Sequence, residues 1–144
     1  LPSPQVWGDT PLIYTPSNMY SSYDFEILFE KSGFTHGFER YQLIGNLTAN
    51  LPPPGVDTVH LYGINKDTRT AFRYASDDSF DEEPEPVYGN GDDTVPLLSL
   101  QSAGRMWNNN NNGKTFAEKS YDQQTHTGIL KNDEYTNDIL QFLQ

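Results

Sequence analysis

The sequence predicts an α/β fold, and within that class the C-terminal layer of an open α/β sheet. From residue 51 onward we expect a strand, a hairpin, a glycine turn with two acids, a helix, a strand, a loop with one histidine, and a final helix. Such an order is typical of open α/β sheets, in which ligands bind outside the carboxyl ends of the strands. Of the 144 residues, 13% are aromatic, which argues against disorder, but only 35% are hydrophobic. The apolar supply is therefore thin for an independent core of this size.

The N-terminal part predicts a region distinct from that sheet. Residues 12–14 are an apolar run between loop-forming residues, which predicts a short strand. A helix start follows, and apolar side chains recur at helical spacing until Gly33 ends the pattern. A weaker segment then leads to Pro52-Pro53-Pro54-Gly55, the strongest break in the chain. We therefore expect two regions, 1–50 and 51–144.

The segments after this break predict two strands and an acidic loop. Residues 56–62 are rich in β-formers and predict a core strand, buried on both faces. Residues 70–74 alternate apolar and polar side chains, like one arm of a hairpin. The carboxylates at 76–86 favour a solvated loop over a calcium site, because they lack the spacing of an EF-hand. The core strand needs neighbours that these residues do not supply, so we expect association with the N-terminal portion of the same protein.

The C-terminal part predicts two helices on either side of a strand. Residues 96–107 have the apolar spacing of a helix, and the asparagine run at 108–112 predicts a loop. Residues 115–121 predict the last strand. Asn132 or Asp133 is then expected to cap a final helix with one apolar face.

The main chemical feature is the glycine turn at residues 87–96, followed by a single downstream histidine, His126. An acid in a turn after a strand, then a histidine before a terminal helix, is typical of the second half of a Ser-His-Asp triad. The alternative is a surface histidine without a role. We assign Asp92 as the acid that orients His126, and we expect Asp93 to serve as the N-cap of the following helix.

The remaining candidates are weaker. His36 is expected on the surface after a helix, and His60 is expected to be a buried, hydrogen-bonded histidine of the core strand. Three dispersed histidines predict no zinc site. A triad of this type needs a Gly-x-Ser-x-Gly turn upstream of the acid, and the sequence contains none. The nearest string, residues 100–104, lacks the first glycine and follows the acid, so we expect the serine in a missing N-terminal segment.

Composition excludes several functions. The formal net charge of −11 disfavours nucleic acid and anionic lipid as partners, but leaves contact with a neutral lipid surface open. The absence of cysteine excludes disulfides and thiolate metal sites. No apolar run approaches the roughly 20 residues of a membrane span. The sequence has no phosphate loop or dinucleotide fingerprint, and we expect no cofactor.

Several separated strings, in the same order, resemble the C-terminal part of the lecithin:cholesterol acyltransferase family, which includes lysosomal phospholipase and phospholipid:diacylglycerol acyltransferases. These strings are Leu1-Pro-Ser-Pro-Gln-Val-Trp7, Thr15-Pro-Ser-Asn-Met-Tyr20 leading to Asp24-Phe25, Pro53-Pro-Gly-Val56, Leu61-Tyr-Gly63 and Gly89-Asn-Gly-Asp-Asp-Thr-Val95.

The resemblance implies the C-terminal portion of an α/β-hydrolase sheet with flanking helices, with residues 1–50 as part of a cap region and 51–144 as part of the core. It implies Asp92 and His126 as triad acid and base. A serine would attack a phospholipid acyl ester, and the acyl group would pass to water, a sterol or another alcohol.

Two departures from the family pattern stand out. Animal members commonly join the positions of His60 and Ala103 by a disulfide, which this chain cannot form. Thr127-Gly128 also replaces a bulkier pair after the histidine, which leaves the acyl acceptor open.

One glycosylation sequon begins at Asn46, and together with the resemblance it predicts a secreted or lysosome-like or vacuole-like location. Two other classes of function stay open. One is a non-catalytic hydrolase fragment that acts as a binding or interaction module, which the absence of the serine motif favours. The other, weaker, is a calcium-binding acidic surface protein.

Overall fold

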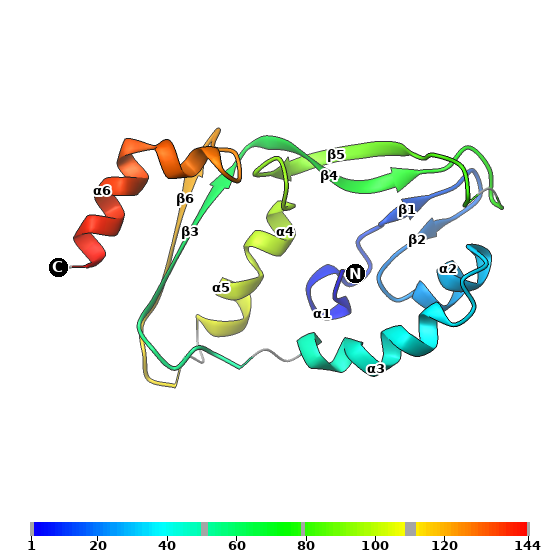
Figure 1. Ribbon diagram of the computed structural model, residues 1–144, viewed down its shortest axis with the longest axis horizontal. Coiled ribbons are helices and arrows are strands. Elements are labelled where there is room, and N and C mark those ends of the chain that lie inside the picture. Colours follow the sequence, from blue (N-terminus) through cyan, green and yellow to red (C-terminus); the bar gives the residue numbers. More distant parts are fainter. Residues whose placement is uncertain (1, 50–51, 79, 109–111, 144) are drawn as a thin grey trace. The chain divides into compact units, whose positions relative to one another are not determined.

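The computed structural model describes residues 2–49, 52–78, 80–108 and 112–143 (Figure 1). The chain divides into two compact units. The first contains Leu1–Leu51 and Thr70–Val87, and the second contains Pro52–Arg69 and Tyr88–Gln144. The division therefore falls inside two strands, β4 (Lys66–Arg73) and β5 (Glu85–Gly91), which contribute to both units.

The first unit is built on a small mixed sheet. β1 (Ile13–Tyr14) pairs antiparallel with β2 (Met19–Tyr20) and parallel with β4, and the strand order is β2-β1-β4-β5. The expected strand at 12–14 is thus present. The expected hairpin arm at 70–74 belongs to β4, which begins earlier, at Lys66.

Three helices complete this unit: α1 (Pro4–Trp7), α2 (Phe25–Lys31) and α3 (Gly37–Ala49). Phe25 of α2 packs edge-on against Tyr41 of α3, with ring centroids 5.0 Å apart. The apolar side chains buried in this unit are those of Trp7, Leu12, Tyr20, Phe25, Leu28 and Ala71.

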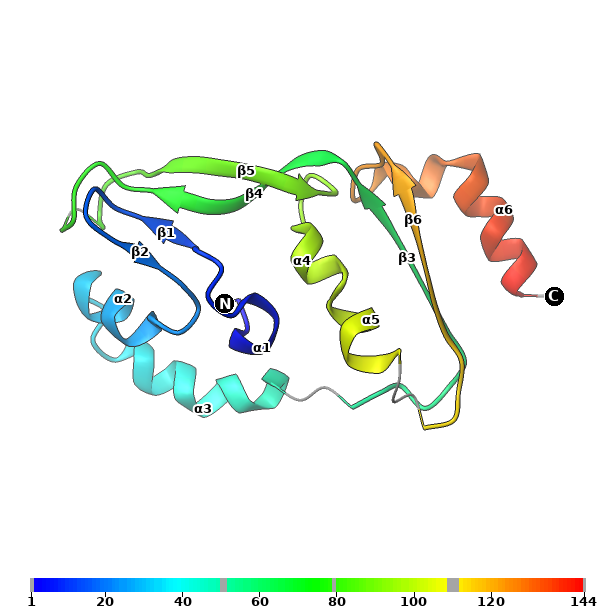
Figure 2. The same ribbon diagram turned by 180° about the vertical axis from the view of Figure 1, so that it is seen from behind.

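The second unit is built on two parallel strands. β3 (Thr58–Ile64) pairs with β6 (Phe116–Asp122) along its whole length, from Thr58 opposite Phe116 to Ile64 opposite Asp122. In Figures 1 and 2, these strands run side by side between α4 (Leu97–Leu100) and α5 (Ser102–Trp107) on one side and α6 (Asp133–Phe142) on the other. The mixed sheet, the parallel pair and the flanking helices together give an α/β architecture.

In this chain β3 is not buried on both faces, which agrees with the expectation that the strand needs neighbours that these residues do not supply. Tyr62 and Gly63 are buried, but the other residues of the strand are partly or fully exposed. Among the described strands, β3 pairs with β6 alone, so the strand lacks the second neighbour that burial requires.

Two helical expectations are resolved in detail. The helix expected at 96–107 is divided into two helices, α4 and α5, with Gln101 between them as the C-cap of the first and the N-cap of the second. The final helix is capped by Asn132, whose Oδ1 accepts the backbone N–H of Tyr135 at 2.9 Å. A short 3₁₀ helix, η1 (Gly128–Lys131), precedes it.

Side-chain contacts attach α6 to β6. The Tyr121 hydroxyl donates to Asp138 Oδ2 at 2.5 Å, and Lys119 Nζ lies 2.6 Å from the same oxygen and 2.9 Å from Glu134 Oε1. Tyr121 is itself buried, at 3% exposure. This cluster fixes the helix that follows the histidine loop. No helix within the described ranges is both long and apolar enough to cross a membrane.

Candidate active site

The predicted acid lies in a tight turn at the end of β5. Asp92 follows Gly91, the last residue of the strand, and is only 3% exposed. A Cβ on Gly91 would clash with the backbone oxygen of Val95 and the side chain of Thr68, so only glycine fits there. Asp93 continues the turn in the left-handed region, with φ of 76°. The turn therefore folds back tightly around the Asp92 carboxylate.

The structure brings Asp92 and His126 into direct contact. Nδ1 of the imidazole lies 2.8 Å from Oδ2 of the carboxylate. The backbone N–H of His126 also donates to the backbone carbonyl of Asp92 at 2.7 Å. One main-chain and one side-chain hydrogen bond thus join the two residues, although they are far apart in the sequence.

The second carboxylate oxygen is held by the turn itself. Oδ1 of Asp92 accepts the backbone N–H groups of Val95 at 2.7 Å and of Thr94 at 3.1 Å. This leaves Oδ2 for the imidazole. The carboxylate is therefore fixed on both sides, with its orientation set by the backbone.

The electrostatics favour an ionised acid. Burial raises the pKa of the Asp92 carboxyl, but hydrogen bonds from Val95 N–H and His126 lower the pKa by more, and Thr94 N–H adds to the effect. The net pKa lies below its usual range, so Asp92 is a carboxylate at neutral pH. A carboxylate facing Nδ1 places the imidazole proton there and makes Nε2 the nitrogen that accepts a proton.

The loop that carries His126 is shaped by its own turn. It leaves β6 through Gln123, at φ of 55°, and Thr125 Oγ1 accepts the N–H of Gly128 at 3.0 Å. A Cβ on Gly128 would clash with that hydroxyl, which explains the glycine. The His126 side chain is 49% exposed while that of Asp92 is 4% exposed. The pair thus combines a buried acid with an accessible base.

The expected role of Asp93 as a helix N-cap is wrong. The N-cap position of α4 is Pro96, which makes no side-chain cap, because the helix begins only at Leu97. Asp93 Oδ1 instead accepts the hydroxyl of Thr94 at 2.7 Å. The carboxylate that accepts backbone N–H groups in this turn is the one on Asp92, and both donors precede the helix.

The other predicted residues lie apart from this pair. His36 is exposed, with Nδ1 3.5 Å from Glu39. His60 is half-buried rather than buried, and its Nδ1 lies 3.2 Å from Glu118 Oε1. Ser102, in the string that resembles a serine motif, donates its hydroxyl to the carbonyl of Ser99 at 2.7 Å. Asn46 lies in α3, but its side chain is outside the described part, and its glycosylation stays a prediction.

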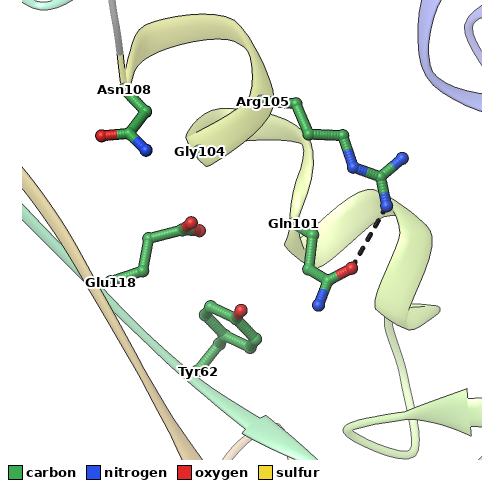
Figure 3. A pocket seen from close by; sticks show the side chains of 6 residues that line it. All are labelled: Tyr62, Gln101, Gly104, Arg105, Asn108 and Glu118. Atoms are coloured by element: carbon green, nitrogen blue, oxygen red, sulfur yellow. Dashed lines mark hydrogen bonds between the residues drawn. The ribbon is translucent and has the colours of Figure 1, made fainter.

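A polar hollow lies elsewhere in the second unit. Figure 3 shows Glu118 and Tyr62 on one side of it and, on the other, α5 and the residues that flank it: Gln101, Gly104, Arg105 and Asn108. Its volume is about 330 Å³, and Arg105 donates to Gln101 Oε1 across its rim at 3.1 Å. Neither Asp92 nor His126 lines this hollow. No group of three or more metal-binding side chains occurs among the residues that the structure describes.

Two residues near the pair could not be found from the sequence. The turn at residues 91–95, which carries Asp92, is called the acid turn below. Thr68 contacts this turn and accepts the Asp93 N–H at 2.9 Å. Asn65, at φ of 63°, exchanges side-chain and backbone hydrogen bonds with Asn90 and also bonds Asp122 at 2.6 Å. Both contacts join segments distant in sequence, and neither residue has a local pattern that signals a role.

A buried carboxylate that orients an exposed imidazole is the arrangement found in the acid and base of serine-hydrolase triads. The family model for lecithin:cholesterol acyltransferase matches residues 15–135. This chain belongs to the lecithin:cholesterol acyltransferase family.

Individual relatives agree. Lecithin-cholesterol acyltransferase-like 1 of Arabidopsis thaliana is 34% identical over 143 residues, which cover 97% of this chain and 31% of that protein. Phosphatidylcholine-sterol acyltransferase of Mus musculus is 33% identical over 106 residues, 73% of this chain and 24% of that protein. The corresponding protein of Gallus gallus is 31% identical over 119 residues, which cover 82% of this chain and 29% of that protein. The chain thus spans less than a third of the length of these relatives.

Proposed function

We propose that this chain carries the acid and base of a serine-type lipid acyl hydrolase or acyltransferase that acts on phospholipid acyl esters. Asp92 is the orienting acid and His126 the general base. The serine nucleophile and the oxyanion donors come from a part of the protein outside these 144 residues. The contact between His126 Nδ1 and Asp92 Oδ2, at 2.8 Å, is the observation that carries the proposal.

The proposed reaction follows from that contact. Nε2 of His126 takes the proton of the serine hydroxyl as the serine oxygen attacks the acyl carbonyl of the phospholipid. The tetrahedral intermediate collapses, the ester C–O bond breaks, and the imidazolium returns the proton to the departing lysophospholipid oxygen. Water or an alcohol then attacks the acyl-serine with His126 again as base, the acyl–serine C–O bond breaks, and the imidazolium returns the proton to the serine oxygen. Asp92 stays ionised throughout and stabilises the imidazolium.

The membership of the family supports the lipid substrate class, since relatives are named for phosphatidylcholine or lecithin as acyl donor. A neutral phospholipid surface fits the net charge of −11 better than an anionic one. We further propose that residues 1–50 belong to a cap region and 51–144 to an α/β-hydrolase core that the N-terminal portion of the same protein completes. A secreted or lysosome-like location is part of this proposal.

The experiment compares two histidine variants in the complete protein. His126→Ala removes the proposed base. His36→Ala removes an exposed histidine whose Nδ1 lies 3.5 Å from the Glu39 carboxylate. Turnover of phosphatidylcholine vesicles is measured with water and with a sterol as acceptor. We expect His126→Ala to lower turnover by about 10³-fold or more, as loss of a triad base does, and His36→Ala to leave it unchanged.

Two outcomes would contradict the proposal. Full turnover by His126→Ala, with an unchanged melting temperature, would remove His126 from the mechanism. Equal losses in both variants would show that the assay reports stability rather than chemistry. In the assay with sterol, the product distinguishes the two reactions: a sterol ester shows transfer to an alcohol, and a free fatty acid shows hydrolysis.

A further inference from the structure

Thr68 is the most completely buried of the polar and charged residues that the structure describes, at 1% exposure. It lies on β4, which is adjacent to β5 in the sheet, as Figures 1 and 2 show. A hydroxyl in such a position is costly unless it is hydrogen-bonded. Here the hydroxyl makes two hydrogen bonds: it donates to the carbonyl of Lys66 at 3.0 Å and accepts the N–H of Asp93 at 2.9 Å.

With the contact to Asp93, three successive backbone N–H groups of the acid turn each have a side-chain acceptor. Thr94 and Val95 donate to Oδ1 of Asp92, while the N–H between them and the strand, that of Asp93, donates to Thr68. If Asp93 N–H lost this acceptor, a backbone donor in a partly buried contact would lose its protein partner, and the turn would relax to satisfy it. Oδ2 of Asp92 would then move relative to the imidazole.

Packing reinforces the same contact. Gly91 approaches Thr68 so closely that a Cβ would clash with its side chain. The left-handed backbone at Asp93, with φ of 76°, is uncommon for residues other than glycine, although aspartate and asparagine adopt it more readily than most, and the hydrogen bond to Thr68 helps to hold it in place. Thr68 contacts the turn on both sides of Asp92, through Gly91 and through Asp93.

We propose that Thr68 is a positioning residue for the Asp92–His126 pair: its hydroxyl fixes the acid turn so that the carboxylate faces Nδ1 in the reactive geometry. This inference rests on the proposed function. Thr68 touches neither substrate nor histidine, and its effect passes through the backbone of the turn. A shift of about 1 Å in a catalytic group can cost about 10²-fold in rate, which sets the scale of the effect.

The test uses four variants of the complete protein. Thr68→Val keeps the shape of the side chain and removes the hydroxyl, while Thr68→Ser keeps the hydroxyl and removes the methyl group. Thr68→Ala and Thr68→Ser differ by one oxygen atom and serve if the valine variant does not fold. Thr70→Val is the matched control, because Thr70 lies on the same strand and donates its hydroxyl to the Val87 carbonyl at 3.2 Å, not to the acid turn.

We expect Thr68→Val and Thr68→Ala to lower kcat by about 10- to 100-fold with little change in KM. Thr68→Ser should keep kcat within a factor of about two even where its melting temperature falls, since the methyl group packs but does not orient the turn. Thr70→Val should keep kcat even if its melting temperature falls. Activity would then follow the hydroxyl at 68 and not stability.

Equal kcat for Thr68→Ala and Thr68→Ser would overturn the inference, as would a loss of kcat in Thr70→Val that matches that of Thr68→Val. His126→Ala, assayed in parallel, separates the two proposals. If that variant is inactive and the hydroxyl at 68 has no effect on kcat, only the role of Thr68 fails. If that variant is fully active, the proposed function fails first.

Discussion

On the proposed mechanism, replacement of Asp92 by asparagine should abolish lipid turnover by the complete protein without unfolding it. In the structure, Oδ1 accepts two backbone N–H groups, from Thr94 and Val95, and Oδ2 faces Nδ1 of His126. Asparagine has one carbonyl oxygen and one NH₂ group. The two backbone donors require the oxygen, so the NH₂ group is directed at Nδ1.

This orientation of the amide reverses the tautomer of the His126 imidazole. An NH₂ group donates, so Nδ1 must accept, and the ring proton moves to Nε2. Nε2 then cannot take the proton of the serine. In a protease triad, the equivalent change lowers kcat about 10⁴-fold, which corresponds to about 5 kcal/mol of transition-state stabilisation. We expect a loss of this size, with a melting temperature within a few degrees of the wild type because the turn keeps both backbone hydrogen bonds.

Asp93→Asn is the matched control. The Asp93 side chain accepts a hydrogen bond from the Thr94 hydroxyl, and the amide oxygen of asparagine can accept the same bond. Asparagine also tolerates the positive φ of this position better than most residues. We expect turnover within about a factor of two of the wild type. Both variants are made in the complete protein and compared by phosphatidylcholine turnover and thermal unfolding. An active Asp92→Asn or an inactive Asp93→Asn would refute the assignment of Asp92 as the acid that orients His126.

Two further predictions concern stability and modification. The pKa of the Asp138 carboxyl is lowered, first by the hydrogen bond from Lys119 and then by that from Tyr121. A lowered pKa in the folded state adds stability above the unfolded-state pKa of about 3.9, and this stability is lost as pH falls through the lower folded-state pKa. The difference in melting temperature between wild type and Asp138→Asn should therefore be present at neutral pH, begin to shrink near about pH 3.9 and vanish only below the folded-state pKa. A constant difference across this range would contradict the ion-pair explanation. If Asn46 is glycosylated, protein from its native source should lose mass on enzymatic deglycosylation, and Asn46→Gln should already have the lower mass; identical masses before and after treatment of the wild type would exclude the modification.

Short sequence patterns were sufficient to locate most elements and both members of the candidate pair. The turn around Asp92 depends on a glycine before it and on backbone donors within three residues after it, all of which are local. The cap at Asn132 is local as well. His126 was singled out as the one histidine between the expected last strand and the final helix, and the structure brings it to Asp92. Their catalytic role is still a prediction.

Features that depend on distant segments could not be predicted. Thr68 contacts the acid turn from another strand, and Asn65 joins the ends of β3, β5 and β6. The assignment of Asp93 as a cap failed because the start of α4 is set by Pro96, two residues beyond Thr94. The strand β3 has a sequence suited to burial, but burial depends on neighbouring strands and not on its own residues.

The hydrogen bond between the His126 N–H and the Asp92 carbonyl has a consequence for how this family can change over time. It belongs to the main chain, so it forms with almost any side chain at either position. A descendant that loses the imidazole or the carboxylate keeps its two loops in register and keeps the space between them. Such a protein would keep the backbone geometry of the pair without one of its side chains, and a single reverse substitution would restore the missing group in place.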